Sequence, residues 1–455
     1  MGTVSDLSYD QAGDAITTGV GDSGTVRRHI ASSKPLLGAY VSLLLFMVVY
    51  FARPEDWIPG LAGVPLAKIA GVLALLAFVF SLGQIRQRLP REIVCLILLT
   101  VQLFLAASLS PVWPGGAFFK TLDFAKVLLI VIVMALSVRT EKRLRQLMFV
   151  QAVSVAVIAA IAIWKGRLLV GRLEGVLKGN YANPNDLALA IAISLPLCLA
   201  LLLLSKWPWK VVWTLAMLVM IYAVFLTGSR GGFISLLVAA AVCLWQFAIR
   251  GRRRFLLLLA GLVGVVLWQS SSKMLSERLI GTVDPQENVA SAYGSAQQRE
   301  ELFWRSVEVT EEHPLVGVGP GNFQGISGSW QVTHNSYTEM SSEGGIPALV
   351  LYVLILWYGF KNVAATKRLV PKQRELALLA YALHASLAGF IAGALFGSEG
   401  YEFFPFFLVA YTTALNWIAR RSASRYETDK RGHEATPENE LHANTIEHQM
   451  SRPSC

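Results

Sequence analysis

A polar stretch between residues 334 and 347 contains the side chains of this sequence that are best suited to proton transfer. It begins with His334, includes Glu339 and Glu343, and runs directly into an apolar segment that starts at Ala348. Histidine can accept and return a proton near neutral pH without a large shift of its pKa. A loop histidine beside a helix is more often a cap or a solvated side chain, so this stretch alone does not establish a catalytic role.

Three arginines stand in the least hydrophobic parts of the chain. Arg172 lies in a short glycine-rich segment, Arg230 lies in the turn Gly228–Gly232, and Arg299 lies in a long polar segment. The guanidinium group is planar, keeps its charge and binds phosphate oxygens in pairs. Each arginine alone could be an ordinary surface residue or could reach lipid headgroups along its aliphatic stem. Placed together with His334 on one side of a membrane, they would form a site for a phosphate-bearing lipid headgroup.

The composition places this chain among membrane proteins. The 455 residues are 54% hydrophobic and 15% charged, with a mean hydropathy of +0.51, whereas soluble proteins carry about 25% charged residues. The net charge of +10 is explained by membrane topology rather than by nucleic-acid binding. The four cysteines form no CxxC pair and indicate neither a disulfide framework nor a metal site.

Apolar runs of bilayer-spanning length predict an all-α polytopic protein with about twelve transmembrane helices. The expected organisation is a disordered cytoplasmic tail at 1–34, nine spans within 35–269, a large outer loop at 270–345, three spans within 346–420 and a second disordered cytoplasmic tail at 421–455. The ninth and tenth spans, Phe255–Gln269 and Ile346–Phe360, are short. The arginine cluster at 250–254 is the strongest indication, under the positive-inside rule, that both termini are cytoplasmic.

The outer loop contains two local patterns. Ser295–Gln298 has the spacing of a helix capping box, and His313-Pro314 would end the helix that follows. The glycine-rich run Gly317–Phe323 resembles a phosphate loop only superficially, because it lacks the Gly-Lys-Ser/Thr that such loops carry. We interpret it as a tight turn.

Several short motifs occur in an order that is specific as a set. They are Arg172 followed by Asn183-Pro184-Asn185, the turn Gly228–Gly232, Arg299 and Trp304 followed by His313–Gly319, and His334-Asn335 followed by Gly345. Together they resemble the O-antigen ligase and polymerase family of polytopic membrane glycosyltransferases, over most of the chain from Arg172 to Phe360. The early stretch Ala52–Pro59 is not part of this motif set.

The resemblance implies a metal-independent glycosyltransferase of GT-C-like architecture in the bacterial inner membrane, without a cofactor. Its donor would be a glycan on undecaprenyl pyrophosphate, and its acceptor a hydroxyl of lipid A core, of another glycan or of a protein, at the periplasmic face. His334 would act as general base, while Arg172, Arg230 and Arg299 would hold the pyrophosphate. Glu343 or Glu339 would orient His334, and the sequence does not decide between them.

The alternative class is a secondary transporter of a small anionic solute, because twelve spans with both ends inside the cell is also a common transporter layout. Transporters place ionisable residues near the middle of the bilayer. Candidates here are Lys68, Asp123 with Lys126 as an ion pair, and His384, which we expect to be buried and hydrogen-bonded. Glu399 and Glu402 flank the last outer turn, where we interpret them as ordinary helix-end carboxylates.

Overall fold

The computed structural model describes residues 36–80, 89–166, 168–169, 172–175, 181, 183–249, 254–255, 258, 261, 290–371 and 373–434. The first half of this region contains α1 (Leu37–Ala52), α2 (Pro54–Trp57), the short 3₁₀ turn η1 (Pro59–Leu61), α3 (Leu66–Val79), α4 (Arg91–Ser108), α5 (Pro114–Ser137) and α6 (Glu141–Lys165). Then follow β1 (Leu168–Leu169), β2 (Arg172–Leu173), α7 (Pro184–Leu204), α8 (Trp209–Thr227), α9 (Arg230–Cys243) and the π-helical turn η3 (Leu244–Ile249). The last elements are α12 (Ala290–Glu312), α13 (Phe323–Ile326), α14 (Ser336–Leu369), α15 (Arg374–Gly393) and α16 (Phe403–Glu434).

The chain is a polytopic, almost entirely helical membrane protein. Among the described residues, eight helices are long and apolar enough to cross a membrane, namely Leu37–Trp57, Arg91–Ser108, Glu141–Lys165, Pro184–Leu204, Trp209–Thr227, Arg230–Ile249, Ser336–Leu369 and Arg374–Gly393. Helices α3, α5 and α16 cover three further expected spans. The expected ninth span, Phe255–Gln269, lies mostly outside the described residues, as does the tail at 1–34.

Three expected boundaries differ from the structure. Helix α16 continues through Arg421 to Glu434, so the beginning of the expected disordered tail is helical, while 435–455 lie outside the described residues. Helix α12 begins at Ala290, so Ser295 lies inside a helix and the capping-box interpretation is wrong, although the helix does end before His313. The tenth span begins after the break of α14 at Gly345, as expected, but its helix continues beyond Phe360 to Leu369.

Small residues let α15 approach its neighbours closely. A Cβ added at Gly393 would lie 2.4 Å from Cδ1 of Leu189 on α7, and one at Gly389 would lie 3.0 Å from the Cβ of Ala239 on α9. The hydroxyl of Ser235 on α9 donates to the carbonyl of Gly389 at 2.8 Å. Close backbone approach and hydrogen bonds of this kind stabilise helix pairs in lipid, where apolar burial contributes little. They fix the end of α15, from which the loop 394–402 emerges.

Helix α14 is broken at Gly345, where the preceding loop is docked against it. Gly345 has φ 79° and ψ 173°, a conformation that only glycine adopts readily. The freed N–H of Ile346 donates to the carbonyl of Pro314 at 2.7 Å, and the N–H of Val318 donates to the carbonyl of Ser342 at 2.9 Å. The segment 336–344 is thereby held as a short helical turn in front of the long apolar part of α14.

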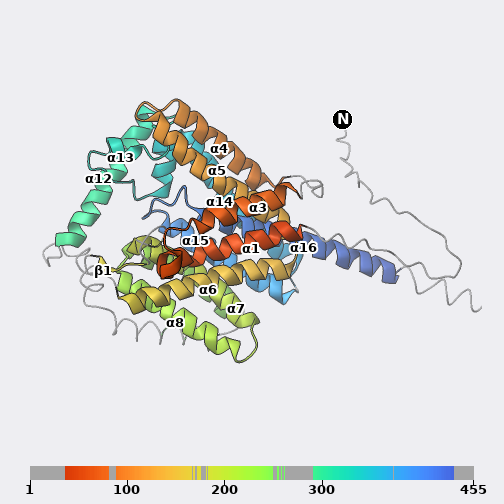
Figure 1. Ribbon diagram of the computed structural model, residues 1–455. Coiled ribbons are helices and arrows are strands. Elements are labelled where there is room, and N and C mark those ends of the chain that lie inside the picture. The colour runs from red at the N-terminus through yellow and green to blue at the C-terminus, as the bar shows by residue number, and fades with distance from the viewer. Residues whose placement is uncertain are drawn as a thin grey trace, which may run out of the picture. The chain divides into compact units, whose positions relative to one another are not determined.

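Figure 1 shows α12 and α13 at one end of the bundle, and α16 leaving the bundle on the opposite side. A small separate core holds α12 in place, formed by Leu302 and Val309 with Val318, Phe323 and Ile326. We refer to the end of the bundle that carries α12, α13 and the start of α14 as the site end.

Candidate active site

His334 lies at the site end in a loop that two other segments hold. Its backbone is in the left-handed region, with φ 53°, a conformation in which histidine is tolerated but which is uncommon outside functional sites. The N–H of His334 donates to Oγ of Ser398 at 3.0 Å. Asn335 caps α14 by accepting from the N–H groups of Tyr337 and Thr338. His334 therefore sits at the N-terminus of α14, fixed on the loop between α15 and α16.

Arg172 and Arg230 are brought together around the start of α7. The guanidinium of Arg172, on β2, donates to the carbonyl of Thr227 at 2.8 Å and to Oδ1 of Asn185 at 2.7 Å. The hydroxyl of Ser229 donates to the same Asn185 oxygen at 2.8 Å. Ser229 also caps α9 by accepting from Gly232 at 3.1 Å, which places Arg230 in the first turn of that helix.

Two glycines in the first turn of α9 bring Arg230 close to the His334 loop. A Cβ at Gly231 would lie 2.5 Å from the Cβ of Phe396, and one at Gly232 would lie 2.3 Å from the Cβ of Ala188. Phe396 belongs to the same loop as Ser398, which holds His334. The Gly228–Gly232 motif is thus required by close packing, and this packing joins the arginine turn to the histidine loop.

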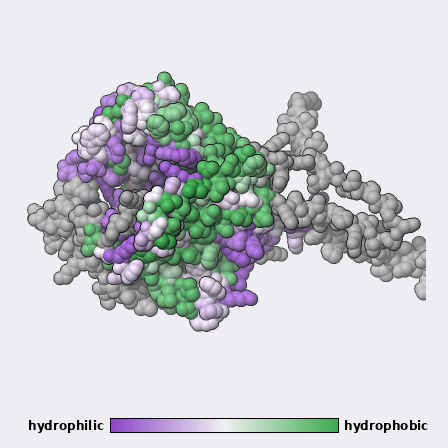
Figure 2. Space-filling model, in the orientation of Figure 1, coloured by the Kyte–Doolittle hydropathy of each residue, from purple (hydrophilic) through white to green (hydrophobic). Residues whose placement is uncertain are grey.

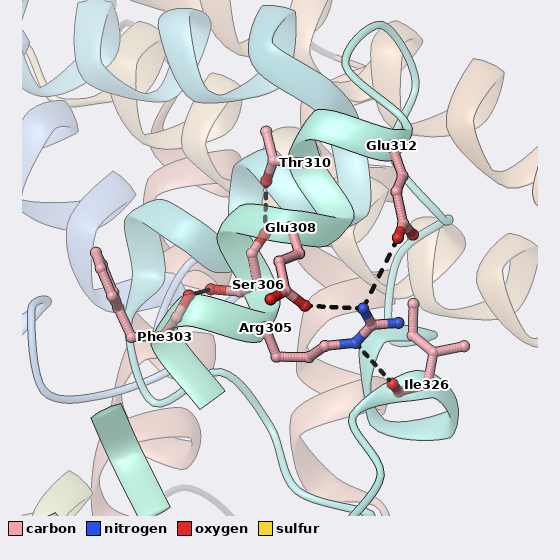
Figure 3. Close-up of polar contacts among 7 residues, drawn as sticks. All are labelled: Phe303, Arg305, Ser306, Glu308, Thr310, Glu312 and Ile326. Atoms are coloured by element: carbon pink, nitrogen blue, oxygen red, sulfur yellow. Dashed lines mark hydrogen bonds and ion pairs between the residues drawn. The ribbon is translucent and has the colours of Figure 1, made fainter. Parts of the chain in front are cut away.

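Arg299 comes from α12, which is anchored to α13. Figure 3 shows Arg305, two turns further along α12, pairing with Glu308 at 3.0 Å and donating to the carbonyl of Ile326 at 3.4 Å. Leu302 lies buried one turn after Arg299. Helix α12 therefore presents the half-buried Arg299 from a fixed position at the site end.

The electrostatics connect His334 to Arg299, and Arg299 to Arg230. Burial and the charge of Arg299 lower the pKa of His334 to about 4, so the imidazole is neutral at pH 7 and has a lone pair available. Burial and the charge of Arg230 in turn lower the pKa of Arg299. Cations whose charges act on one another and on His334 favour an anionic ligand. Figure 2 shows hydrophilic side chains gathered around a hollow at this end, beside α12.

Glu343 does not contact His334, contrary to one of the two options that the sequence left open. It is 4% exposed, and its carboxylate accepts from the N–H of Gly321 at 2.6 Å and of Phe323 at 3.3 Å. The glycine-rich run is indeed a turn, and its backbone donors bind a carboxylate of this chain rather than a phosphate. Glu339 accepts from the N–H of Gly400 at 2.9 Å, which makes it a second anchor of the 394–402 loop. The described hydrogen bonds therefore give both carboxylates a role in holding loops.

Glu399 is not an ordinary helix-end carboxylate. It is 4% exposed, its N–H donates to the hydroxyl of Ser336 at 2.9 Å, and its carboxyl hydrogen-bonds the carboxyl of Asp186. Burial and the charges of Asp186, Glu402 and Glu339 raise the pKa of Glu399. The sequence indicated the turn that contains Glu399. It gave no sign that Asp186, more than two hundred positions earlier, would lie beside this residue.

The residues that indicated a transporter make local contacts instead. Asp123 and Lys126 pair with each other on an exposed face of α5, as expected. His384 is hydrogen-bonded to Gln246 at 3.0 Å and to Lys367 at 3.2 Å, as expected, although its side chain is half-buried rather than buried. Lys68 lies on an exposed part of α3.

The comparison with known families agrees with this arrangement. Residues 215–353 match the family model described as O-antigen ligase. These residues form an O-antigen ligase domain. The matched range contains Arg230, Arg299, His334 and Glu343, whereas Arg172 precedes it and reaches it through the carbonyl of Thr227. No curated protein matches the chain. The general chemistry of this domain is ligase-type glycosyl transfer, with lipid-linked glycans as donors and glycans as acceptors.

The ligase domain is completed by segments on both sides of it. The loop 394–402 after the domain provides Ser398 to His334, and the start of α7 before the domain provides Asn185 to Arg172. Sequence inspection did not identify Ser398. The sequence marks Ser398 only as a polar residue in a short turn after an apolar helix, which is a weak indication of a functional role.

Proposed function

We propose that this chain transfers a glycan from an undecaprenyl-pyrophosphate carrier to an acceptor hydroxyl at the periplasmic face of the inner membrane. The observation that carries the proposal is the position of Arg299, whose charge acts on a neutral His334 while Arg230 acts on Arg299. A base and a group of cations at one place suit a reaction in which a hydroxyl is deprotonated and a diphosphate leaves.

In this mechanism the arginines act on the leaving group. Arg230 and Arg299 would bind the pyrophosphate oxygens, and Arg172, which is already bonded to Asn185 and Thr227, would hold the arginine turn in place and extend the positive surface. Donors fixed in advance toward developing negative charge are the largest single source of catalysis in many enzymes. Pyrophosphate is a good leaving group once its charge is compensated, so the transfer needs no nucleotide.

His334 would take the proton of the acceptor hydroxyl as that oxygen attacks the anomeric carbon. The C–O bond to the carrier phosphate breaks as the new glycosidic bond forms, and the proton remains on the imidazole until the product leaves. The bound diphosphate would raise the basicity of His334 by offsetting the field of Arg299. The acceptor hydroxyl would belong to lipid A core, to another glycan or to a protein.

The experiment is a transfer assay with the purified protein in detergent. Undecaprenyl-pyrophosphate-linked glycan is mixed with lipid A core, with free glycan or with a hydroxyl-bearing peptide, in the presence and absence of a chelator. Transfer that continues with the chelator supports the proposal, and the productive acceptor identifies the branch of the family. Failure to transfer to every acceptor, together with solute uptake in proteoliposomes, would instead favour the transporter class.

The pH dependence of the reaction follows from the lowered pKa of His334. Because the neutral imidazole is the active form, kcat/KM should be constant above about pH 5 and should fall about tenfold per pH unit below the pKa of about 4. The acid limb of kcat should lie at higher pH, because bound diphosphate favours the protonated imidazole. Steady-state rates at saturating and limiting donor separate the two limbs. An acid limb of kcat/KM at the ordinary histidine pKa, about 6.5, would contradict the electrostatic environment described above.

A further inference from the structure

A second polar group of side chains lies at the site end, and the proposed transfer does not use it. It surrounds the hydroxyl of Tyr50, near the end of α1. We call it the acidic arm, and its members are Tyr50, Arg53, Lys120, Asp186, Glu399, Glu402 and Tyr181. It draws on five separate parts of the chain, so no local sequence pattern could have revealed it.

Arg53 of the acidic arm belongs to the stretch Ala52–Pro59, which the family motifs do not include. It ends α1 in the left-handed region, with φ 42° and ψ 58°, and its guanidinium pairs with Asp56. A residue other than glycine in this conformation costs about 1–3 kcal/mol. Its charge acts on Glu402 and on Tyr181. Arg53 is half-buried, and strained residues of this kind cluster at binding and active sites.

Tyr181 supplies an observation that points to a ligand. Its side chain is 1% exposed, and its hydroxyl has no hydrogen-bond partner among the described residues. The hydroxyl lies among the groups of the acidic arm, close to Tyr50 and Arg53. A buried hydroxyl without a partner costs free energy, so it is expected to gain one when a ligand is present.

The side chains of the acidic arm select the chemistry of that ligand. Three carboxyl groups, Asp186, Glu399 and Glu402, stand beside the two cations Arg53 and Lys120. Burial raises the pKa of Glu399 and of Glu402, and a carboxyl group accepts hydrogen bonds in either state and can also donate one when it is protonated. Carboxyls, a guanidinium and phenol hydroxyls in one place match the adjacent hydroxyls of an uncharged sugar.

The acidic arm is continuous with the transfer site. Asp186 follows Asn185, which accepts from Arg172, and Glu399 follows Ser398, which holds His334. The acidic arm and the arginines therefore share supporting segments of the chain. A ligand in the acidic arm would be held by the same segments that hold Arg172 and His334.

We propose that the acidic arm is the acceptor subsite, where Tyr181, Glu402 and Arg53 bind the hydroxyls of an uncharged sugar of the acceptor glycan. This inference rests on the proposed transfer reaction. It assigns the stretch Ala52–Pro59 a role in acceptor recognition, separate from the arginines that would bind the anionic donor.

The test is the substitution Tyr181→Phe, which removes only the unpartnered hydroxyl. The protein should fold as the wild type does, because no intramolecular hydrogen bond is lost. The KM for the acceptor should rise about 3- to 10-fold, as expected for one lost hydrogen bond, while the KM for undecaprenyl-pyrophosphate-linked glycan stays unchanged. The matched control is Tyr411→Phe, which removes another buried hydroxyl without a described partner, on α16 and away from the charged groups.

The assay uses whichever of lipid A core, free glycan or hydroxyl-bearing peptide the wild type glycosylates. Unchanged acceptor KM in Tyr181→Phe, or a rise in the donor KM instead, would overturn the acceptor subsite and leave the transfer reaction standing. A wild type that glycosylates none of the three would overturn the transfer reaction and the subsite together. A rise in acceptor KM in both tyrosine variants would also count against the subsite, because the effect would then not depend on position.

Discussion

Replacing His334 with Asn is expected to lower kcat for glycan transfer by about 10²–10⁴-fold, the usual contribution of a general base. Asparagine tolerates the left-handed backbone that His334 adopts at φ 53°, so the hydrogen bond from the backbone of residue 334 to Ser398 should persist. The loss should therefore be in the chemical step, with donor affinity close to that of the wild type. Single-turnover rates at saturating donor and acceptor measure it directly.

His313→Ala is the matched control for His334→Asn. His313 also lies at the site end, but only its backbone makes described hydrogen bonds, from its N–H to Val309 and from Gly317 to its carbonyl. This variant should retain wild-type activity. A His334→Asn variant with kcat within a few-fold of the wild type would remove the general-base role of His334, even if the arginines remained essential.

Replacing Arg299 with Ala is expected to lower kcat/KM by about 10²–10³-fold, in the range found when a preorganised donor to developing charge is removed. Two effects combine in this variant. The diphosphate loses a cation that would bind it, and His334 loses the charge that lowers its pKa. The acid limb of kcat/KM should consequently move to higher pH, a shift that a purely structural role of Arg299 would not produce.

Two further substitutions test whether the effect of Arg299→Ala comes from its charge, from the shape of its guanidinium or from destabilisation of α12. Arg299→Lys keeps the charge without the planar fork, so it should preserve the low pKa of His334 while recovering only part of the rate. Arg305→Ala, on the same helix, removes a guanidinium whose described partners are Glu308, Glu312 and the carbonyl of Ile326, so it loosens the anchoring of α12 while keeping Arg299, and its loss in kcat/KM should be much smaller than that of Arg299→Ala. Equal losses in Arg299→Ala and Arg305→Ala would mean that α12 is merely destabilised.

The features that could be predicted from the sequence are those with a local signal. Apolar runs predicted the membrane helices because a bilayer requires about 20 apolar residues in succession. Arg230 and His334 stood out because polar motifs at the ends of such runs are uncommon. The turn Gly228–Gly232 was recognisable as a motif, but the reason for its glycines, contact with Phe396 and Ala188, required the structure.

The features that could not be predicted depend on segments that are distant in sequence. Glu343 was one of two carboxylates expected to orient His334, yet the helical segment 336–344 directs its carboxylate to the N–H groups of Gly321 and Phe323. Glu399 looked like an ordinary helix-end carboxylate because the sequence around it gives no sign that Asp186 lies beside it. The start of α12 was placed too late because the spacing of a capping box can also occur inside a helix. Ser295–Gln298 is such a case, since α12 begins at Ala290.

The configuration of the newly formed glycosidic bond tests the central claim most directly. A single attack on the anomeric carbon, with His334 as base and the arginine-held diphosphate departing from the opposite side, must invert that carbon. The donor glycan of known anomeric configuration is transferred by the wild-type protein, and the configuration of the linkage sugar in the product is determined by NMR from its one-bond C–H coupling. The mechanism predicts inversion in every product chain. Retention of configuration would mean that the acceptor does not attack in one step from the side opposite the diphosphate, and it would contradict the account.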